Sequence, residues 1–290
     1  AHMKESANND YQNMAIDGIA ITVYATQDTV EYDSTTNDYD KDANVTLVTP
    51  ETAAEVFSSA GGNHVRNASG TYVLTPGMYS LNTIEFYGTE PVTLIAEKGA
   101  TFSSDNIAVT YWSASYKDGD MRYTPAQKGS LTVTGFNSPN SVLRVTGDAP
   151  SITVKDNTVQ ALRLQIKDAA KDITVEGNTF SGNSVDGVDS NLYVVAETSD
   201  YDLTVKGNTF AGADSHAIAV QGNKDGADNI TVTGNTFNSY GANKKADRAA
   251  FKIWGDSKYA PNETDPLNDA AKALADEIKT NNTFANNLGS

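Results

Sequence analysis

A motif that ends in Gly-Asn-Thr-Phe recurs three times and constrains the fold more than any other feature of the chain. It occupies residues 173–180, 203–210 and 230–237, each time as Ile or Leu, Thr, Val, a polar residue, Gly, Asn, Thr and Phe. Degraded copies lie at 131–136, 152–159 and 278–284. The copies that begin at residues 131, 152, 173, 203 and 230 are 21, 21, 30 and 27 residues apart. A unit recurring at this period predicts a solenoid.

The residue types within the motif predict how each unit folds. The Ile-x-Val part alternates apolar and polar residues, which indicates a strand with one buried face. Gly and Asn tolerate left-handed backbone conformations, so Gly-Asn indicates a sharp turn, and Thr-Phe resumes a strand. Stacking of such coils predicts one ladder of amides and one of rings. The expected members are Asn157, Asn178, Asn208, Asn235 and Asn282, and Phe180, Phe210, Phe237 and Phe284.

The Ile-x-Val-x-Gly-Asn-Thr-Phe run resembles the right-handed parallel β-helix of the pectin-lyase-like superfamily, over about residues 70–287. The fold class expected is therefore all-β, a solenoid with a short N-terminal capping helix and a helical insertion near the C-terminus. The resemblance is specific for the fold alone. One such fold hosts lyases, hydrolases, esterases, phage tailspikes and non-catalytic adhesins.

Three segments are expected along the chain. Residues 1–3 resemble a cloning scar, residues 4–45 form an N-terminal strand and acidic loop, and residues 46–290 form the β-helix domain. The N-terminal 40 residues resemble the end of camelysin/TasA-type exported proteins of Gram-positive bacteria. That resemblance implies an extracellular or cell-surface location. Within the loop, Asp38, Asp40 and Asp42 are candidate Ca²⁺ ligands, because Ca²⁺ prefers oxygen donors; a solvated acidic loop is the alternative, and no other cofactor is expected.

The amino-acid composition limits the classes of partner that this chain is expected to bind. The chain has no Cys, and 37 acidic residues outnumber 21 basic ones, for a formal net charge of −16. Such a charge argues against nucleic acid or an anionic membrane as partner. No stretch reaches the length of a transmembrane helix, so we expect no membrane insertion. A monomer that binds a polysaccharide or a cell-surface glycan remains compatible with this composition.

Two helices and one aromatic loop interrupt the repeats. Residues 50–60 carry an apolar stripe and are expected to close the N-terminal end of the solenoid, with Thr49 as the cap. Residues 266–278 carry a second stripe, expected to pack on the flank or to shield the C-terminal end. Residues 111–128 are rich in Asp, Gly and aromatic residues and are expected to be a loop. Trp112 and Tyr116 on that loop could stack on sugars, or pack as a lid.

A second strand of each later coil is expected at 142–145, 162–166, 192–196, 218–221 and 251–254. Aligned by their inward apolar positions, the outward residues of these strands form three lanes. The first lane is Arg144, Arg163, Tyr193, Ala219 and Lys252; the second is Thr146, Gln165, Val195, Gln221 and Trp254; the third is Asp148, Lys167, Glu197, Asn223 and Asp256. We predict that these lanes bind the glycan, chiefly through Arg163, Gln165, Tyr193, Gln221, Lys252 and Trp254.

The catalytic motifs of the superfamily are not reproduced in this sequence. Polygalacturonase-like members of the superfamily carry an Asp-Asp pair and a Gly-His-Gly motif; this chain has no Asp-Asp pair, and His216 stands between Ser215 and Ala217. The remaining catalytic candidates are Glu197, Asp256 and Arg163. The leading hypothesis is a non-catalytic, glycan-binding or adhesin-type surface protein. The alternatives are a polysaccharide lyase or glycoside hydrolase with a divergent site, and a structural protein of the surface or biofilm matrix.

Overall fold

The computed structural model describes residues 44–57, 64–117, 120–123, 129–167, 170–184, 189–197, 200–221, 229–241, 250–254 and 269–285. For His64, residues 115–117 and 120–123, Trp254 and residues 269–271, only the backbone is described. The chain divides into the units Ala1–Ala43 and Asn44–Ser290. All described residues lie in the second unit, so the camelysin-like segment and the candidate Ca²⁺ ligands Asp38, Asp40 and Asp42 lie outside them.

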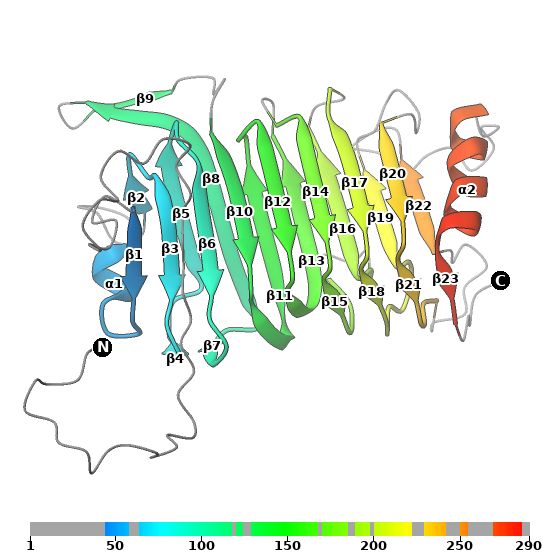
Figure 1. Cartoon of the computed structure of the whole chain (residues 1–290), viewed down its shortest axis with the longest axis horizontal. Helices are drawn as coiled ribbons and strands as arrows, with labels where there is room; N and C mark the ends of the chain where they lie inside the picture. Colours follow the sequence, from blue (N-terminus) through cyan, green and yellow to red (C-terminus); the bar gives the residue numbers. More distant parts are fainter. Residues whose placement is uncertain are drawn as a thin grey trace, which may run out of the picture. The chain divides into compact units, whose positions relative to one another are not determined.

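The Ile-x-Val segments form one sheet of eight parallel strands (Figure 1). Its strands, in spatial and in chain order, are β1 (Val45–Val48), β3 (Gly70–Leu74), β6 (Val92–Ala96), β10 (Ser130–Thr134), β12 (Ser151–Lys155), β14 (Asp172–Glu176), β17 (Asp202–Lys206) and β20 (Ile230–Thr233). Their burial alternates as the period-2 pattern predicts: in β12, Ile152 and Val154 are buried, whereas Thr153 is half-buried on the outer side.

A second sheet holds the Thr-Phe strands and the outward lanes. Its main path is β2 (His64–Arg66), β5 (Thr83–Gly88), β8 (Asn106–Lys117), β11 (Asn137–Gly147), β13 (Thr158–Ile166), β15 (Thr179–Phe180), β18 (Thr209–Phe210), β21 (Thr236–Phe237) and β23 (Thr283–Phe284). From β13 a branch continues through β16 (Leu192–Ala196), β19 (Ile218–Gln221) and β22 (Phe251–Trp254). The two predicted strands of a coil are thus continuous in β11 and β13 and separate in later coils. A small parallel pair, β4 (Gly77–Tyr79) and β7 (Ala100–Phe102), completes the early coils.

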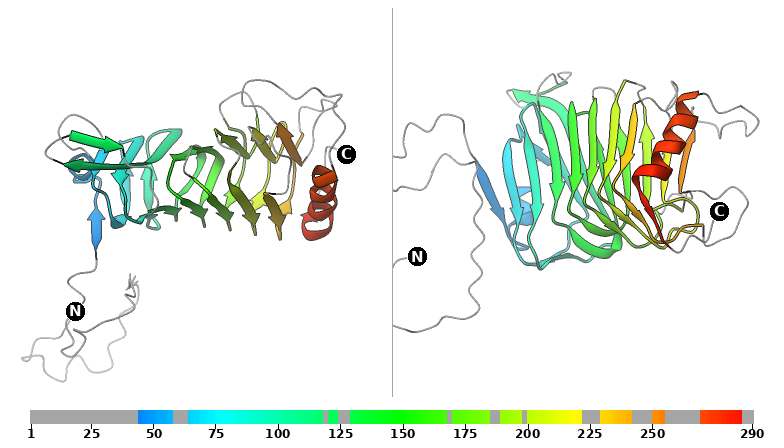
Figure 2. Two further views of the ribbon diagram at one scale, coloured as in Figure 1. Left: turned by 90° about the horizontal axis from the view of Figure 1, so that it is seen from above. Right: turned by 45° about the vertical axis from the view of Figure 1, so that its right-hand side comes forward.

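Successive coils contribute neighbouring strands to the same sheet, so the chain winds as a right-handed parallel β-helix. From β10 to β14, each coil lies on the next in register, with Ile152 paired to Leu131 on one side and Ile173 on the other. The apolar residues between the sheets form one continuous core. The two views in Figure 2 show the same stacking along the described coils. The predicted fold class is therefore confirmed.

The turn of each repeat adopts the predicted left-handed backbone. Gly177, Gly207 and Gly234 have φ angles of 65°, 64° and 65°. The degraded copy has Asp156 at this position, with φ of 55°. Asp is one of the few residues other than Gly that adopts this backbone conformation at modest energetic cost. The turn therefore keeps its shape although Asp156 stands where the other repeats have Gly.

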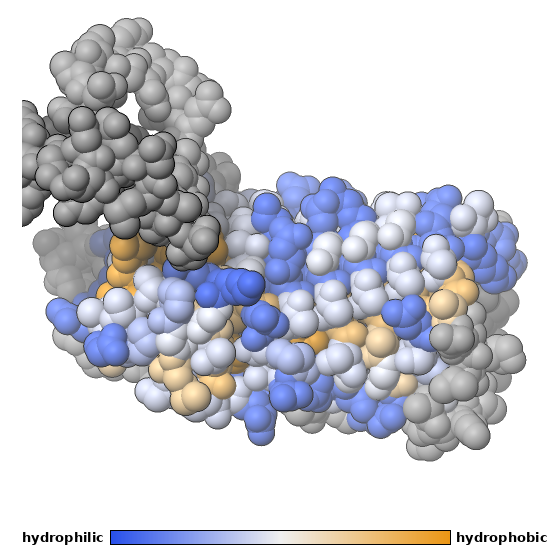
Figure 3. All heavy atoms as spheres, turned by 60° about the horizontal axis from the view of Figure 1, so that its bottom comes forward, coloured by the Kyte–Doolittle hydropathy of each residue, from blue (hydrophilic) through white to orange (hydrophobic). Residues whose placement is uncertain are grey.

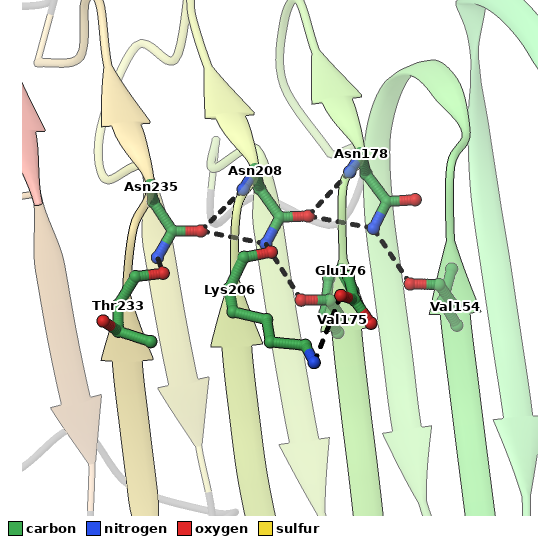
Figure 4. A network of polar contacts seen from close by, with 8 residues as sticks. All are labelled: Val154, Val175, Glu176, Asn178, Lys206, Asn208, Thr233 and Asn235. Atoms are coloured by element: carbon green, nitrogen blue, oxygen red, sulfur yellow. Dashed lines mark hydrogen bonds and ion pairs between the residues drawn. The ribbon is translucent and has the colours of Figure 1, made fainter.

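The predicted asparagine ladder is present and fully bonded (Figure 4). From Asn178 onward, the side-chain oxygen of each Asn accepts two hydrogen bonds from the preceding Asn, one from the backbone N–H and one from Nδ2; the oxygen of Asn157 accepts from the backbone N–H of Phe136. For Asn208 and Asn178 these distances are 2.9 and 3.0 Å. Each Nδ2 also donates to a strand carbonyl of the preceding coil, as Asn208 does to Val175 at 2.9 Å. The same pattern links Asn157, Asn178, Asn208, Asn235 and Asn282.

The predicted aromatic ladder is also present. Phe180, Phe210, Phe237 and Phe284 stack with centroid separations of 5.2, 5.0 and 4.9 Å. A second stack, not predicted, joins Tyr79, Phe102 and Phe136 in the earlier coils at 5.6 and 5.3 Å. Stacked pairs contribute about 0.5–1.5 kcal/mol each beyond simple burial. Both ladders therefore hold neighbouring coils in register.

The N-terminal helix is shorter than expected. Helix α1 spans Ala53–Val56, and residues 58–63 lie outside the described part of the chain. The cap position is assigned to Thr52, whose side chain makes no cap bond, but the predicted Thr49 side chain does bond the first turn, because Thr49 Oγ1 accepts from the backbone N–H of Thr52 at 3.3 Å. The backbone N–H of Thr49 donates in return to Thr52 Oγ1 at 2.9 Å, so the two threonines form a reciprocal capping pair. Phe57 is buried against Tyr72 and Phe86, with centroids 6.2 and 6.0 Å away.

The second helix, α2, spans Asp269–Asn281, so it ends three residues beyond the predicted Ile278. Asn282 explains the extension, because its Nδ2 donates to the carbonyl of Ile278 at 2.9 Å while its oxygen continues the ladder. Leu274 and Ile278 are buried, and α2 lies at the C-terminal end of the stack beside β20 (Figure 1). No helix among the described residues is long and apolar enough to cross a membrane.

The predicted loop at 111–128 is wrong in its first half, which is a β-hairpin. The end of β8 pairs antiparallel with β9 (Asp120–Tyr123), Lys117 opposite Asp120 and Ala114 opposite Tyr123. The hairpin runs from its coil toward the N-terminal end of the stack (Figures 1 and 2). Asp118-Gly119 between two extended segments is a strong hairpin signal, and the high polarity of the segment concealed it.

Candidate ligand-binding face

The structure brings the predicted lanes together in register. In the first lane, Arg144 pairs with Arg163, Arg163 with Tyr193, Tyr193 with Ala219, and Ala219 with Lys252. In the second, Thr146, Gln165, Val195, Gln221 and Trp254 pair in the same order. Of the third lane, Asn223 and Asp256 lie outside the described residues. The alternation of inward and outward residues was thus sufficient to predict which side chains are neighbours.

Tyr193 does not offer an open ring. Only 7% of its surface is exposed, and its hydroxyl donates to Gln221 Oε1. The guanidinium of Arg163 lies 5.9 Å from the centre of its ring. In a ladder with a spacing of about 4.8 Å the neighbouring coils lie against both sides of a side chain. Tyr193 is therefore a part of the framework that orients Arg163 and Gln221, rather than an exposed stacking surface.

Glu197 is held as a charged acceptor. Its Oε1 accepts from Lys167 Nζ, with which it forms an ion pair, and from Gln165 Nε2 at 2.7 Å. The hydrogen bond from Lys167 is the largest influence and lowers the pKa of the Glu197 carboxyl; burial opposes it, and the hydrogen bond from Gln165 and the charge of Lys167 lower the pKa further. A general acid of a glycosidase needs a raised pKa. The arrangement suits a carboxylate that positions Gln165 and Lys167.

The predicted pairing of Glu197 with Asp256 stays a prediction, because Asp256 lies outside the described residues. His216 is only 2% exposed, at the turn before β19. Asp148, in the third lane, is 5% exposed, and its Oδ1 accepts from the backbone N–H of Ser113 at 2.7 Å. Asp148 was expected to face outward in the third lane, and His216 was a weak catalytic candidate. They are buried because the turns of adjacent coils stack on each other as closely as the strands do.

The predicted Ca²⁺ ligands Asp38, Asp40 and Asp42 lie outside the described residues, so the Ca²⁺ prediction stays a prediction. Among the described residues, no three or more His, Cys, Asp or Glu side chains are placed to hold a metal ion together.

On the earlier coils, the predicted ligand-binding residue Trp112 lies in a row with Tyr87 and Arg66, which were not predicted from the sequence. Tyr87 pairs in register with Trp112, and Arg66 pairs with Tyr87. All three are half-buried on the outward side of β2, β5 and β8. The signal was the alternation in β5, where buried Ile84 and Phe86 place Glu85 and Tyr87 on the outer side. Tyr111, the residue before Trp112 in β8, is buried on the inner side and anchors this part of the sheet. Its hydroxyl donates to the Glu90 carbonyl at 2.9 Å, and burial raises the pKa of that hydroxyl.

The Ile-x-Val sheet presents a different exterior. Its outward positions form a Thr lane of Thr71, Thr93, Thr132, Thr153, Thr174, Thr204 and Thr231. The neighbouring positions include an ion pair between Lys206 and Glu176 at 3.1 Å. Thr side chains paired across neighbouring strands stabilise a sheet, so this lane has a structural role without any ligand. Figure 3 shows another consequence of stacking in register, because side chains of one kind recur in rows across the described coils.

Comparison with known proteins agrees with this geometry. Residues 130–263 match the family model described as the right-handed β-helix region. No curated protein and no solved structure gave a significant match to the chain. The matched region includes every strand from β10 to β22. Its repeats and the parallel coils that they form identify this chain as a right-handed parallel β-helix protein.

Proposed function

We propose that this protein is a non-catalytic glycan-binding protein of the bacterial cell surface or extracellular space, and that the outward lanes of the second sheet hold the glycan. The observation that supports the proposal most is the register of the lanes. Side chains able to donate or accept hydrogen bonds stand on consecutive coils, at steps of about 4.8 Å. Such an array suits an extended polymer that repeats along the same axis.

Two features favour binding over bond cleavage. Gln165, Lys167 and Glu197 are already bound to one another, so little side-chain entropy is lost when a ligand meets them. The carboxylate with the lowered pKa is a poor proton donor at neutral pH. From β5 to β22 the face spans seven strands, about 29 Å, with the rings of Tyr87 and Trp112 toward one end.

The test is affinity electrophoresis of the protein against a panel of neutral and acidic polysaccharides, with assays for new reducing and new unsaturated ends. We expect at least one polysaccharide to retard the protein without new ends. The double change Gln165→Ala and Lys252→Ala should abolish the retardation. The control, Thr174→Ala and Lys155→Ala, also removes one lysine and one neutral hydrogen-bonding side chain, here from the other sheet, and should leave the retardation unchanged.

Three outcomes contradict the proposal. New chain ends that appear with time would make the protein an enzyme. If both double variants are retarded as strongly as the parent, the binding site lies elsewhere, and Trp112→Ala is the next variant to measure. Absence of retardation by every polysaccharide would favour a structural role in a surface or matrix layer.

A further inference from the structure

The two ends of the eight-stranded sheet differ in what lies against them. At the C-terminal end, α2 lies beside the last strand, β20, and the backbone N–H of Gly234 donates to the carbonyl of Asn281 at 2.7 Å (Figure 1). A helix in this position shields the edge of a sheet from other strands. At the N-terminal end, β1 is the first strand of the sheet. None of the elements that the structure describes pairs with the side of β1 that faces away from β3.

Strand β1 lacks the features that usually protect such an edge. Natural sheets cover their edge strands or place charged residues and Pro on them. The strand β4 of this protein is protected in that way, because Pro50 lies against Gly77 at its start. In contrast, β1 has the sequence Val-Thr-Leu-Val, without a charge or a Pro. Its Leu47 is 63% exposed, so an exposed apolar side chain stands on an edge that invites pairing.

The hydrogen bonds of β1 show which of its backbone groups face that edge. The carbonyls of Asn44 and Val48 accept backbone hydrogen bonds from the adjoining coil, at 2.7 and 2.9 Å. The N–H and C=O groups of one strand residue point to the same side, and successive residues alternate between sides. Thr46 therefore also faces β3, whereas the N–H and C=O groups of Val45 and Leu47 point away from it.

We propose that β1 pairs antiparallel with β1 of a second copy of this chain, around a two-fold axis that passes between the two Thr46 residues. In this register, Val45 of one copy stands opposite Leu47 of the other, and the two residues exchange both of their backbone hydrogen bonds. Their side chains lie on the same face of the joined sheet, because directly opposite residues share a face. Leu47 thereby packs against Val45 of the second copy and, diagonally, against its own counterpart.

A closed dimer is the assembly that these two ends allow. A head-to-tail contact would need β1 to pair with the C-terminal edge of another copy, where α2 lies, and contacts of that kind produce open filaments. A two-fold contact uses the same edge of both copies and leaves no further edge of this kind to pair. The proposal therefore replaces the monomer expected from the composition by a dimer, and it does not depend on the glycan-binding function proposed above.

The first experiment is sedimentation velocity of the full chain over a range of concentrations, which gives the dissociation constant of the dimer. Val45→Pro removes an N–H that faces away from β3 and keeps the hydrogen bonds between β1 and β3. Because the two-fold axis repeats the loss, the dimer should weaken about tenfold or more. Leu47→Lys places a charge on the edge and should weaken it at least as much. The matched control is Met78→Lys on β4, since Met78 is 69% exposed; it should leave the dissociation constant unchanged.

The second experiment tests the register. Thr46 meets Thr46 of the second copy as a non-hydrogen-bonded pair, with Cα atoms about 4.5 Å apart, which is within the range of a disulfide. The chain has no Cys, so Thr46→Cys should form a covalent dimer on oxidation. Thr204→Cys, on a middle strand of the same sheet, is the control and should remain without a cross-link.

Each contrary result overturns a stated part of the proposal. A parent protein that sediments as a monomer at every concentration overturns the dimer. Dissociation constants of Val45→Pro and Leu47→Lys equal to that of the parent, with circular dichroism showing that both are folded, place the contact elsewhere. Filaments or an open series of larger species contradict the two-fold axis. A dimer that Leu47→Lys weakens but Thr46→Cys does not cross-link contradicts the register about Thr46.

Discussion

Replacement of Asn208 by Ala tests how much the asparagine ladder contributes to the stack. The side chain is buried in the middle coil, and its Oδ1 accepts from both the backbone N–H and Nδ2 of Asn178. Both donors lose their acceptor in the variant. Each buried, unsatisfied donor costs about 1–3 kcal/mol, so the free energy of unfolding should fall by about 2–6 kcal/mol.

The magnitude is measured by urea unfolding, followed by far-ultraviolet circular dichroism and by tyrosine fluorescence. Asn282→Ala is the matched variant at the end of the ladder, where Asn282 is half-buried. Water can replace its oxygen there, so we expect a loss nearer 1 kcal/mol. Thr204→Ala, on the outer side of the same coil as Asn208, should stay within about 0.5 kcal/mol of the parent.

Asn208→Asp adds a pH dependence whose sign follows from the contacts. The new carboxylate would face the carbonyl oxygens of Val175 and Lys206, to which Asn208 Nδ2 now donates at 2.9 and 3.0 Å. The other carboxylate oxygen would still accept from Asn178, but full burial together with the two carbonyl oxygens raises the pKa of the carboxyl in the folded state above its unfolded value, near 4. The stability of this variant should therefore be highest below about pH 4 and fall as pH rises through the folded pKa. If Asn208→Ala unfolds at the same urea concentration as the parent, the ladder does not stabilise the stack as argued.

The other predictions concern the rings, the end of the stack and one carboxylate. Phe210→Ala, in the middle of the Phe stack, should cost about 3–5 kcal/mol by thermal and urea unfolding, with Phe210→Leu clearly less costly; equal losses would contradict a role for stacking. Leu274→Asp and Ile278→Asp should open the C-terminal end of the core, and light scattering should then detect aggregates, whereas monodisperse variants would show that α2 does not shield that end. In a carbon-13 NMR titration, Glu197 should ionise below the usual pH for a glutamate, and Lys167→Gln should move the midpoint upward. Because Glu197 is 41% exposed, the stability that this pair contributes should be at most a few tenths of a kcal/mol, present at neutral pH and lost as pH falls through the lowered pKa.

Much of the fold could be predicted from the order of residues alone. Gly-Asn-Thr-Phe at regular intervals predicts the turns, both ladders and the stacking of parallel coils, because a repeat with one apolar side can bury it only against its own copies. The alternation along each strand also predicted the neighbours of Arg163 and Gln165 correctly. These predictions succeeded because the side chains of a strand alternate strictly, so the assignment of one buried residue determines the outward set.

What the sequence by itself determined is therefore the repeating framework: which residues turn, which form ladders and which face outward in register. Only the tertiary structure decided which outward residues are accessible. Tyr193 and Trp112 both occupy outward positions, yet Tyr193 is buried beside Arg163 and Gln221, whereas Trp112 stays half-buried next to Tyr87. Exposure depends on the side chains of the coils before and after, which lie 20 to 30 residues away in the sequence. The residue pattern of a single strand does not show which side chains the neighbouring coils place beside it.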